Sequence, residues 1–185
     1  MPLLRGRERQ RAMNCWAVLA TGPSMSQEVA DSVRGRCSVI AVSDAYRLAP
    51  WADVLVSQDA GWWRVHPDSK DFKGRKFAGV DVPDVEKFPS ASGCNSGLLA
   101  CQVAVSLGAK RILLLGVELR GAHFFGLHPK PLRNTQPHRF DAFQEQFKRY
   151  QPKGVDIVNV TDRSALKCYR RSTLEAELAC AMSVA

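Results

Sequence analysis

The sequence predicts an α/β fold, a doubly wound and mostly parallel Rossmann-like sheet with helices on both of its faces. Apolar runs of strand length alternate with helix-compatible stretches along nearly the whole chain. One run, RILLLGVEL at 111–119, is apolar on both faces, as are parallel strands that helices cover on two sides. Small or polar residues follow most of these runs, which is typical of parallel strands that end at a shared ligand site.

In the first half of the chain, strands are expected at 15–20, 38–42 and 53–57, with a weaker candidate at 75–80. Residues 25–35 carry Val29 and Val33 at helical spacing, and Gly35 is a residue type that often follows a helix. Short helical or irregular connections are expected at 44–50 and 58–66, and an irregular segment at 82–92, which holds two prolines.

The second half contains the clearest unit, a helix opened by the segment at 92–97 and ended by Gly108, followed by the strand at 111–119. A polar loop with three of the four histidines comes next. A helix at about 139–150, a short strand at 155–160 and a C-terminal helix from about Arg171 complete the prediction.

The composition indicates one globular domain, expected at 14–185, behind a basic N-terminal arm at 1–13 that we expect to be flexible. The formal net charge of +8 favours anionic partners such as nucleotides, phosphorylated substrates, nucleic acid or anionic glycans. The arginine-rich segment at 5–11 is interpreted as a frayed end, with nucleic-acid binding as the alternative.

Six cysteines stand mostly inside apolar runs, without a CxxC pair or ligand-like spacing. No signal-like segment and no apolar stretch near the length of a membrane span is present, so a reduced, cytoplasmic protein without a membrane span is expected. His123 and His128 have no third ligand at a convincing spacing, so no metal site is assigned.

Two turns before predicted helices have the composition of anion-binding backbone. The first turn is Gly22, Pro23 and Ser24, and the second turn is Asn95, Ser96 and Gly97, within SGCNSG at 92–97. Free N–H groups at a helix start attract a phosphate, and two such turns suggest a nucleotide with its phosphates between them. The first turn matches neither GxGxxG nor a P-loop, and a plain helix start is its alternative interpretation.

Candidate chemical groups lie after the strands. Ser43, Asp44 and Asp59 are assigned to the nucleotide site, and Glu118, His123 and His128 are the catalytic candidates. A loop histidine suits general acid or base chemistry because its pKa lies near working pH. His66 and His138 are expected at the surface. No GxSxG elbow is present, so serine hydrolase chemistry is unsupported.

Four segments, at 18–27, 39–63, 92–119 and 155–166, together resemble a family of small Rossmann-like proteins of bacteriophages and prophages. That family is similar to the domain of archaeal hydroxymethylpterin pyrophosphokinases and, more distantly, to small single-domain bacterial sialyltransferases. The resemblance implies that the first turn, Ser43 and the second turn line a nucleotide site. Thr21 and Ser43 replace two asparagines of the sialyltransferases, and Phe125 and Leu127 interrupt a stretch that is richer in histidine in the phage relatives.

These observations predict a nucleotide-binding transferase, foremost a sialyltransferase-like glycosyltransferase with a nucleotide-sugar donor and an acceptor that can be anionic. One alternative is a Mg²⁺-dependent pyrophosphoryl transferase, in which Asp59 and Glu118 hold the metal. The other is a non-catalytic phage accessory protein that binds nucleotide, or nucleic acid through the basic arm. If the chain is phage-encoded, the expected compartment is the host cytoplasm.

Overall fold

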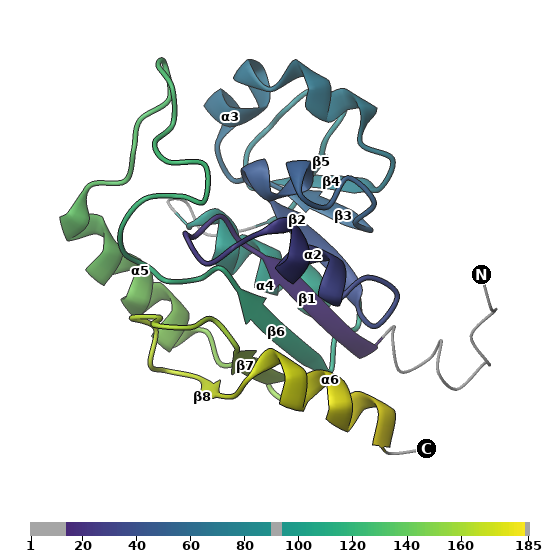
Figure 1. Ribbon diagram of the computed structural model, residues 1–185. Helices are drawn as coiled ribbons and strands as arrows, with labels where there is room; N and C mark the ends of the chain where they lie inside the picture. Colours follow the sequence, from purple (N-terminus) through teal and green to yellow (C-terminus); the bar gives the residue numbers. More distant parts are fainter. Residues whose placement is uncertain (1–13, 90–93, 184–185) are drawn as a thin grey trace.

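The computed structural model describes residues 14–89 and 94–183, and these form an α/β fold around one sheet (Figure 1). The predicted basic arm at 1–13 and Ser92 lie outside the described residues. In chain order, the described strands are β1 (Cys15–Leu19), β2 (Ser38–Val42), β3 (Val54–Val56), β4 (Arg75–Ala78), β5 (Glu86–Lys87), β6 (Arg111–Leu115), β7 (Asp156–Asn159) and β8 (Arg170–Arg171). The helices are α2 (Gln27–Ser32), α3 (Ala60–Val65), α4 (Ser96–Ser106), α5 (Pro137–Arg149) and α6 (Leu174–Ser183), with 3₁₀ helices η1 (Ser43–Arg47) and η2 (Pro67–Asp71).

The predicted Rossmann-like α/β class is confirmed, and every strand pair in the described sheet is parallel. Three details of the predicted elements are wrong. The strand expected at 111–119 ends at Leu115, and Gly116 after it has a φ of 69°. The segment at 82–92, expected to be irregular, contains β5, and the C-terminal helix begins at Leu174 because Arg170–Arg171 form β8. Each of these edge strands has two exposed residues, too few to show an apolar period.

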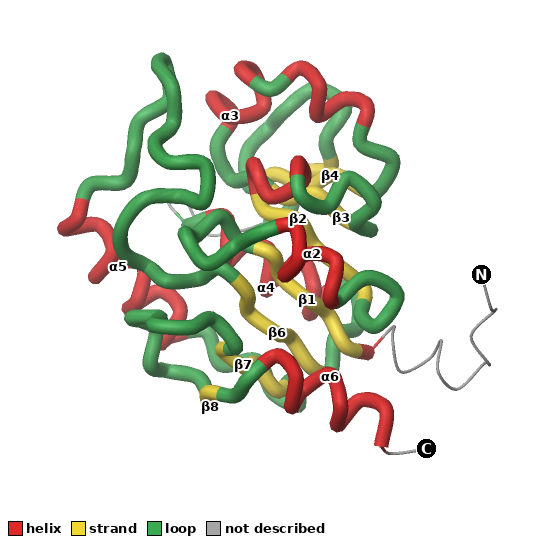
Figure 2. Tube along the Cα trace, in the orientation of Figure 1, coloured by secondary structure: helices red, strands yellow, loops and turns green. Residues whose placement is uncertain are grey.

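Helices cover both faces of the sheet because side chains alternate along each strand. On β1, Trp16 and Val18 pack toward α4 and α5, while Ala17 and Leu19 pack toward α2, α3 and α6. Figure 2 shows α2 and α6 in front of the strands and α4 behind them. Burial on both faces explains why the central strands are apolar throughout, as the sequence predicted.

The strand order is β5-β4-β3-β2-β1-β6-β7-β8, so the chain changes direction once across the sheet. It runs outward from β1 to β5, and α4 then returns it to β6 on the other side of β1, where Leu19 pairs with Leu115. Ligands of open α/β sheets bind at such a switch point, outside the carboxyl ends of the strands. The loop between β6 and α5 runs along this edge of the sheet in Figure 1.

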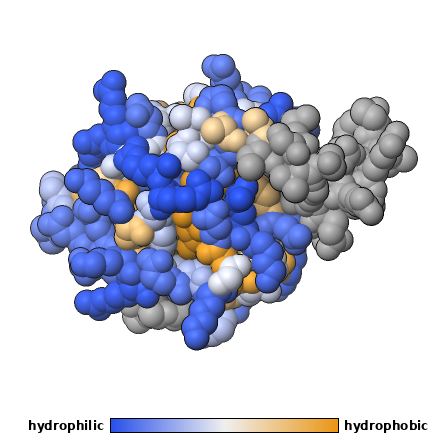
Figure 3. Space-filling view, turned by 90° about the horizontal axis from the view of Figure 1, so that it is seen from below, coloured by the Kyte–Doolittle hydropathy of each residue, from blue (hydrophilic) through white to orange (hydrophobic). Residues whose placement is uncertain are grey.

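Within the described part of the chain, no helix is both long and apolar enough to cross a bilayer. The face seen from below in Figure 3 is largely hydrophilic, and apolar surface is visible at the bottom of a hollow in its middle.

Candidate functional site

The first turn holds an anion that belongs to the protein itself, the carboxylate of Glu118. The backbone N–H of Ser24 donates to Glu118 Oε1 at 2.8 Å. Gly22 donates its N–H to the carbonyl of Gly116 at 2.9 Å, and Pro23 has no N–H. Every backbone donor of the first turn therefore has a partner within the protein.

Glu118 also explains the glycine of the first turn. The glutamate is 4% exposed, and its second oxygen, Oε2, is buried without a hydrogen-bond partner. A Cβ atom added to Gly22 would lie 1.5 Å from this oxygen and 2.5 Å from the Gly116 carbonyl oxygen. Glycine at this position is thus required by the close approach of Glu118 and the chain after β6.

The second turn begins α4 at the carboxyl edge of the sheet. The Asn95 side chain caps the helix by accepting the N–H of Leu98 at 2.9 Å. The Ser96 hydroxyl accepts the N–H of Gln58 at 3.0 Å, which ties the helix start to the end of β3. Among residues 14–89 and 94–183, no acceptor is present for the N–H groups of Ser96 and Gly97, as is usual for the first turn of a helix.

A second group of site residues surrounds Asp44, which follows β2 and is 2% exposed. The indole N–H of Trp62 donates to Asp44 Oδ2 at 2.8 Å, and His66 Nε2 lies 3.1 Å from Oδ1. The His66 ring stacks on Trp62, and its Nδ1 lies 2.8 Å from the Trp62 carbonyl oxygen. The expectation of a surface position for His66 is wrong, because the residue is 5% exposed.

The loop between β6 and α5 brings His123 and His128 to the same place. His123 Nδ1 lies 2.8 Å from the Thr21 hydroxyl oxygen, and the two histidine rings are 4.5 Å apart between centroids. His128 Nδ1 lies 3.9 Å from Asp44 Oδ2 and is buried without a hydrogen-bond partner. We call Asp44, His66, His123 and His128 the histidine cluster.

Burial is the largest cause of the shifted pKa values of the two loop histidines, His123 and His128. It lowers the pKa of His123 and His128 below the ordinary histidine value, and the neighbouring His128 lowers that of His123 further. The charge of Asp44 acts in the opposite direction on both pKa values. The two loop histidines are therefore kept neutral at neutral pH, as a proton acceptor must be.

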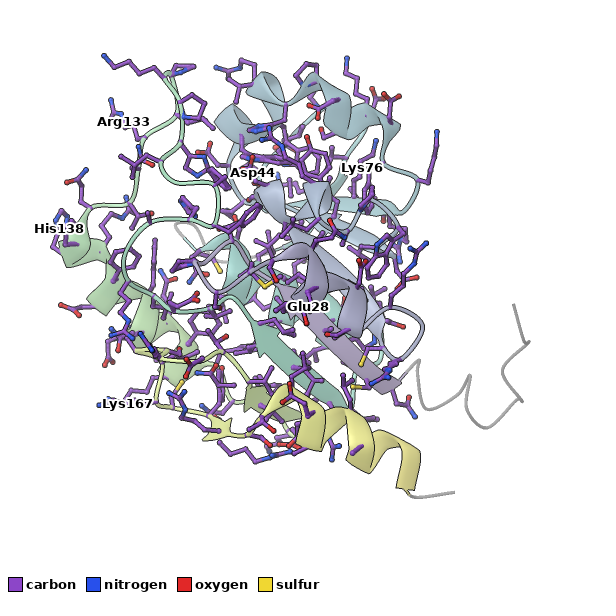
Figure 4. The ribbon with its side chains drawn as sticks, viewed as in Figure 1. Glu28, Asp44, Lys76, Arg133, His138 and Lys167 are labelled. Carbon is purple, nitrogen blue, oxygen red and sulfur yellow. The ribbon has the colours of Figure 1, made fainter. Side chains whose placement is uncertain are left out.

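Backbone contacts fix the loop that carries these histidines. Phe124 donates its N–H to the Thr21 carbonyl at 2.9 Å, directly before the first turn. His128 donates its N–H to the side chain of Asn134 at 2.7 Å. In Figure 4, Asp44 lies between this loop and the α3 region, whereas Arg133 and His138 point outward. His138 is exposed, as the sequence predicted.

The remaining predicted residues have local partners. Ser43, with a φ of 47°, donates its hydroxyl to the Ser57 hydroxyl at 3.0 Å. Asp59 is exposed and caps α3 by accepting the N–H of Gly61 at 2.7 Å. Glu118 and Asp59, the pair expected to hold Mg²⁺, each accept a backbone N–H instead, from Ser24 and Gly61 respectively. No group of three or more His, Cys, Asp or Glu side chains in the described ranges is arranged to hold a metal ion.

The comparisons with known proteins add no family to this description. The chain matches no protein-family model, no curated protein and no solved structure. The fold and the contacts of the site therefore carry the functional argument.

Proposed function

We propose that this protein is a nucleotide-binding transferase that moves a group from a nucleotide-activated donor to an acceptor hydroxyl, in the manner of a sialyltransferase-like glycosyltransferase. The observation that carries the proposal is the histidine cluster, with its carboxylate, at the carboxyl edge of the sheet. A base of this kind is what an acceptor hydroxyl requires when it attacks an activated donor.

His128 is the proposed general base. If the hydrogen of the neutral ring is on Nδ1 and points toward Asp44, the lone pair of Nε2 is available. This lone pair would take the proton of the acceptor substrate's hydroxyl group. Asp44 then stabilises the imidazolium that forms, as the carboxylate of a catalytic triad does. The 3.9 Å separation is longer than a hydrogen bond, and such contacts often shorten only when substrate binds.

The second turn is the proposed phosphate site of the donor. The N–H groups of Ser96 and Gly97, which have no acceptor among the described residues, lie on the first turn of α4, where the helix dipole favours negative charge. Negative charge that develops on the leaving nucleotide would be stabilised there. The net charge of +8 is consistent with an anionic donor.

A thermal-shift panel of nucleotides and nucleotide sugars, with and without Mg²⁺, tests the proposal. A ligand at a hundred times its Kd stabilises the fold by about 2.7 kcal/mol. We expect a nucleotide sugar to stabilise the wild type without Mg²⁺. We expect it to stabilise Ser96→Ala less, because this variant keeps the backbone N–H but loses the hydroxyl that ties the start of α4 to Gln58. Ser106→Ala, which removes a hydroxyl at the other end of α4, is the matched control and is expected to behave as the wild type.

Two results of the panel would replace the proposal. Stabilisation by ATP only when Mg²⁺ is present would favour a pyrophosphoryl transferase. Stabilisation by an oligonucleotide added to the same panel, without stabilisation by any nucleotide sugar, would favour a non-catalytic accessory protein.

A further inference from the structure

Two cysteine side chains meet at the amino edge of the sheet, opposite the edge that carries the candidate site. Cys15 is the first residue of β1, and Cys37 directly precedes β2. Both residues are free thiols, and their Sγ atoms lie 3.2 Å apart as a hydrogen-bonded pair. The two cysteines are 22 positions apart in the sequence, so the fold brings them together and no local motif does.

The backbone places the two cysteines where a disulfide bond can form. Trp16 and Ser38, which follow the two cysteines, are paired in the parallel ladder of β1 and β2. Neighbouring strands of a sheet lie about 4.8 Å apart. A disulfide bond joins Cα atoms that are roughly 4.4–6.8 Å apart. A bond between the two sulfurs therefore requires no rearrangement of the sheet.

The surroundings of Cys15 favour its thiolate. The hydrogen bond with Cys37 is the largest cause that lowers the pKa of Cys15 below the ordinary thiol value. Arg111, which is paired with Cys15 in the ladder of β1 and β6, lowers this pKa further, while burial and the charge of Glu177 oppose the shift. The same hydrogen bond raises the pKa of Cys37, so Cys15 is the sulfur that ionises first.

The remaining thiols that the structure describes are less suited to oxidation. Burial is the largest cause that raises their pKa values, at Cys94, Cys101 and Cys168. A raised pKa leaves less thiolate, and the thiolate is the form that an oxidant attacks. The cysteine pair is thus distinguished from the other described cysteines by its contact and by its charge.

A small oxidant has a short path to the pair. Cys15 and Cys37 are 8% and 6% exposed, whereas Cys101 in the core is 0% exposed. Asn14 and Arg36, which directly precede the two cysteines, are exposed at the surface. The pair therefore lies one residue below the surface at the start of two strands.

We propose that Cys15 and Cys37 form a redox site, at which hydrogen peroxide oxidises Cys15 and Cys37 then closes an intramolecular disulfide bond. The Cys15 thiolate attacks one peroxide oxygen, the O–O bond breaks, and Cys15 becomes a sulfenic acid as hydroxide leaves. The Cys37 sulfur loses its proton and attacks the Cys15 sulfur, and the S–S bond forms as the S–O bond breaks. The thiols lose two electrons and two protons in total, and the peroxide becomes two water molecules.

This proposal is independent of the proposed transferase function. The two sulfurs lie at the amino ends of β1 and β2, whereas the histidine cluster and the second turn lie at the carboxyl edge of the sheet. Oxidation of the pair needs no nucleotide and no acceptor, so its test reads neither.

Peptide mass mapping of the reduced full chain, after brief treatment with equimolar hydrogen peroxide, tests the proposal. We expect a Cys15–Cys37 disulfide bond, reversible by dithiothreitol, to form at least about tenfold faster than any other cysteine is oxidised. The same treatment of the chain unfolded in urea is the control, and there the preference for this bond is expected to disappear. Earlier oxidation of another cysteine in the folded protein, or the same preference in the unfolded chain, would overturn the proposal.

Two variants assign the order of the steps. Cys37→Ser keeps a hydroxyl beside Cys15 but cannot form the disulfide bond, so a sulfenic acid is expected to accumulate at Cys15. Unfolding in the presence of a cyclic 1,3-diketone traps this group for mass mapping, and no adduct at Cys15 would overturn the proposal. Cys15→Ser is expected to leave Cys37 reduced, and a sulfenic acid there instead would contradict Cys15 as the attacking sulfur. Cys37→Ala repeats the test if Ser perturbs the fold in a thermal melt.

Cys168→Ser is the matched control, because it removes a thiol that is partly exposed and lies away from the pair. It is expected to form the Cys15–Cys37 bond at the wild-type rate. A slower rate in this variant would mean that Cys168 carries the oxidation, which would overturn the proposal.

Discussion

The Nδ1 atom of His128 lies 3.9 Å from a carboxylate oxygen of Asp44, which joins the two sides of the switch point. Asp44 follows β2 on one side of β1, and His128 follows β6 on the other. The same carboxylate contacts His66 and Trp62 from α3 and its end. Asp44 is therefore the residue that links His66 and Trp62 to His128.

Replacing Asp44 by Asn is expected to lower the free energy of unfolding by about 1–3 kcal/mol, because it replaces one oxygen of a buried carboxylate that contacts Trp62 and His66. The Asn side chain has one oxygen instead of two, so it can accept the Trp62 indole N–H only if its NH₂ group faces His66. Urea denaturation measures the change. Asp31→Asn, at an exposed position on α2, should remain within about 0.5 kcal/mol of the wild type, and an equal loss in both variants would contradict this account.

Gly22→Ala is expected to destabilise the protein by about 1–3 kcal/mol or more, because the new methyl group overlaps Glu118 Oε2 and the Gly116 carbonyl. Gly97→Ala is the comparison, since its Cβ would lie 3.2 Å from Asn95 Oδ1 and 3.6 Å from Phe147. Thermal unfolding of the two variants should place Gly22→Ala well below Gly97→Ala. The reverse order would mean that Glu118 does not occupy the first turn.

The stability of the protein is expected to fall as the pH is lowered below about 6.5, the ordinary histidine pKa. The pKa values of His123 and His128 are lowered in the folded protein, so below that pH the unfolded chain binds more protons than the folded one. The stabilisation is complete above the unfolded pKa and is lost as the pH falls toward the folded values. Denaturation curves at pH 7.5, 6.5 and 5.5 should show a smaller loss in a His123→Gln/His128→Gln variant, and equal slopes would count against burial as the cause.

Asn95→Ala is expected to cost about 1 kcal/mol, because it removes the side-chain acceptor for the Leu98 N–H at the start of α4. Asn95→Asp keeps an acceptor oxygen and should restore most of the stability. A chemical denaturation series of the three proteins measures the difference. If Asp fails to rescue what Ala loses, the cap does not stabilise the helix.

The sequence predicted the fold well because its main signals are local. Strands such as β6 are apolar on both faces, and Gly35 and Gly108 follow their helices with φ values of 74° and 93°. The edge strands were missed because two exposed residues carry no period. Secondary structure is set by neighbours in the chain, and short edge strands are set by the strand beside them.

The sequence selected several residues that the structure brings together, but it did not predict the contacts between them. Glu118 and the first turn were both selected, yet their hydrogen bond joins residues 94 apart in the sequence. His66 was placed at the surface because its partner Asp44 lies on another element. The spacing of Trp62 and His66, four residues apart, was the one local signal for their stacked contact.

The most direct test of the proposed transferase is the release of nucleotide from a panel of nucleotide sugars, with water or a glycan acceptor, compared between the wild type and His128→Gln. The account predicts release by the wild type from at least one donor. It also predicts a rate at least about a hundredfold lower in His128→Gln, with donor binding unchanged. Release at the same rate in both proteins, or none from any donor that binds, would contradict it.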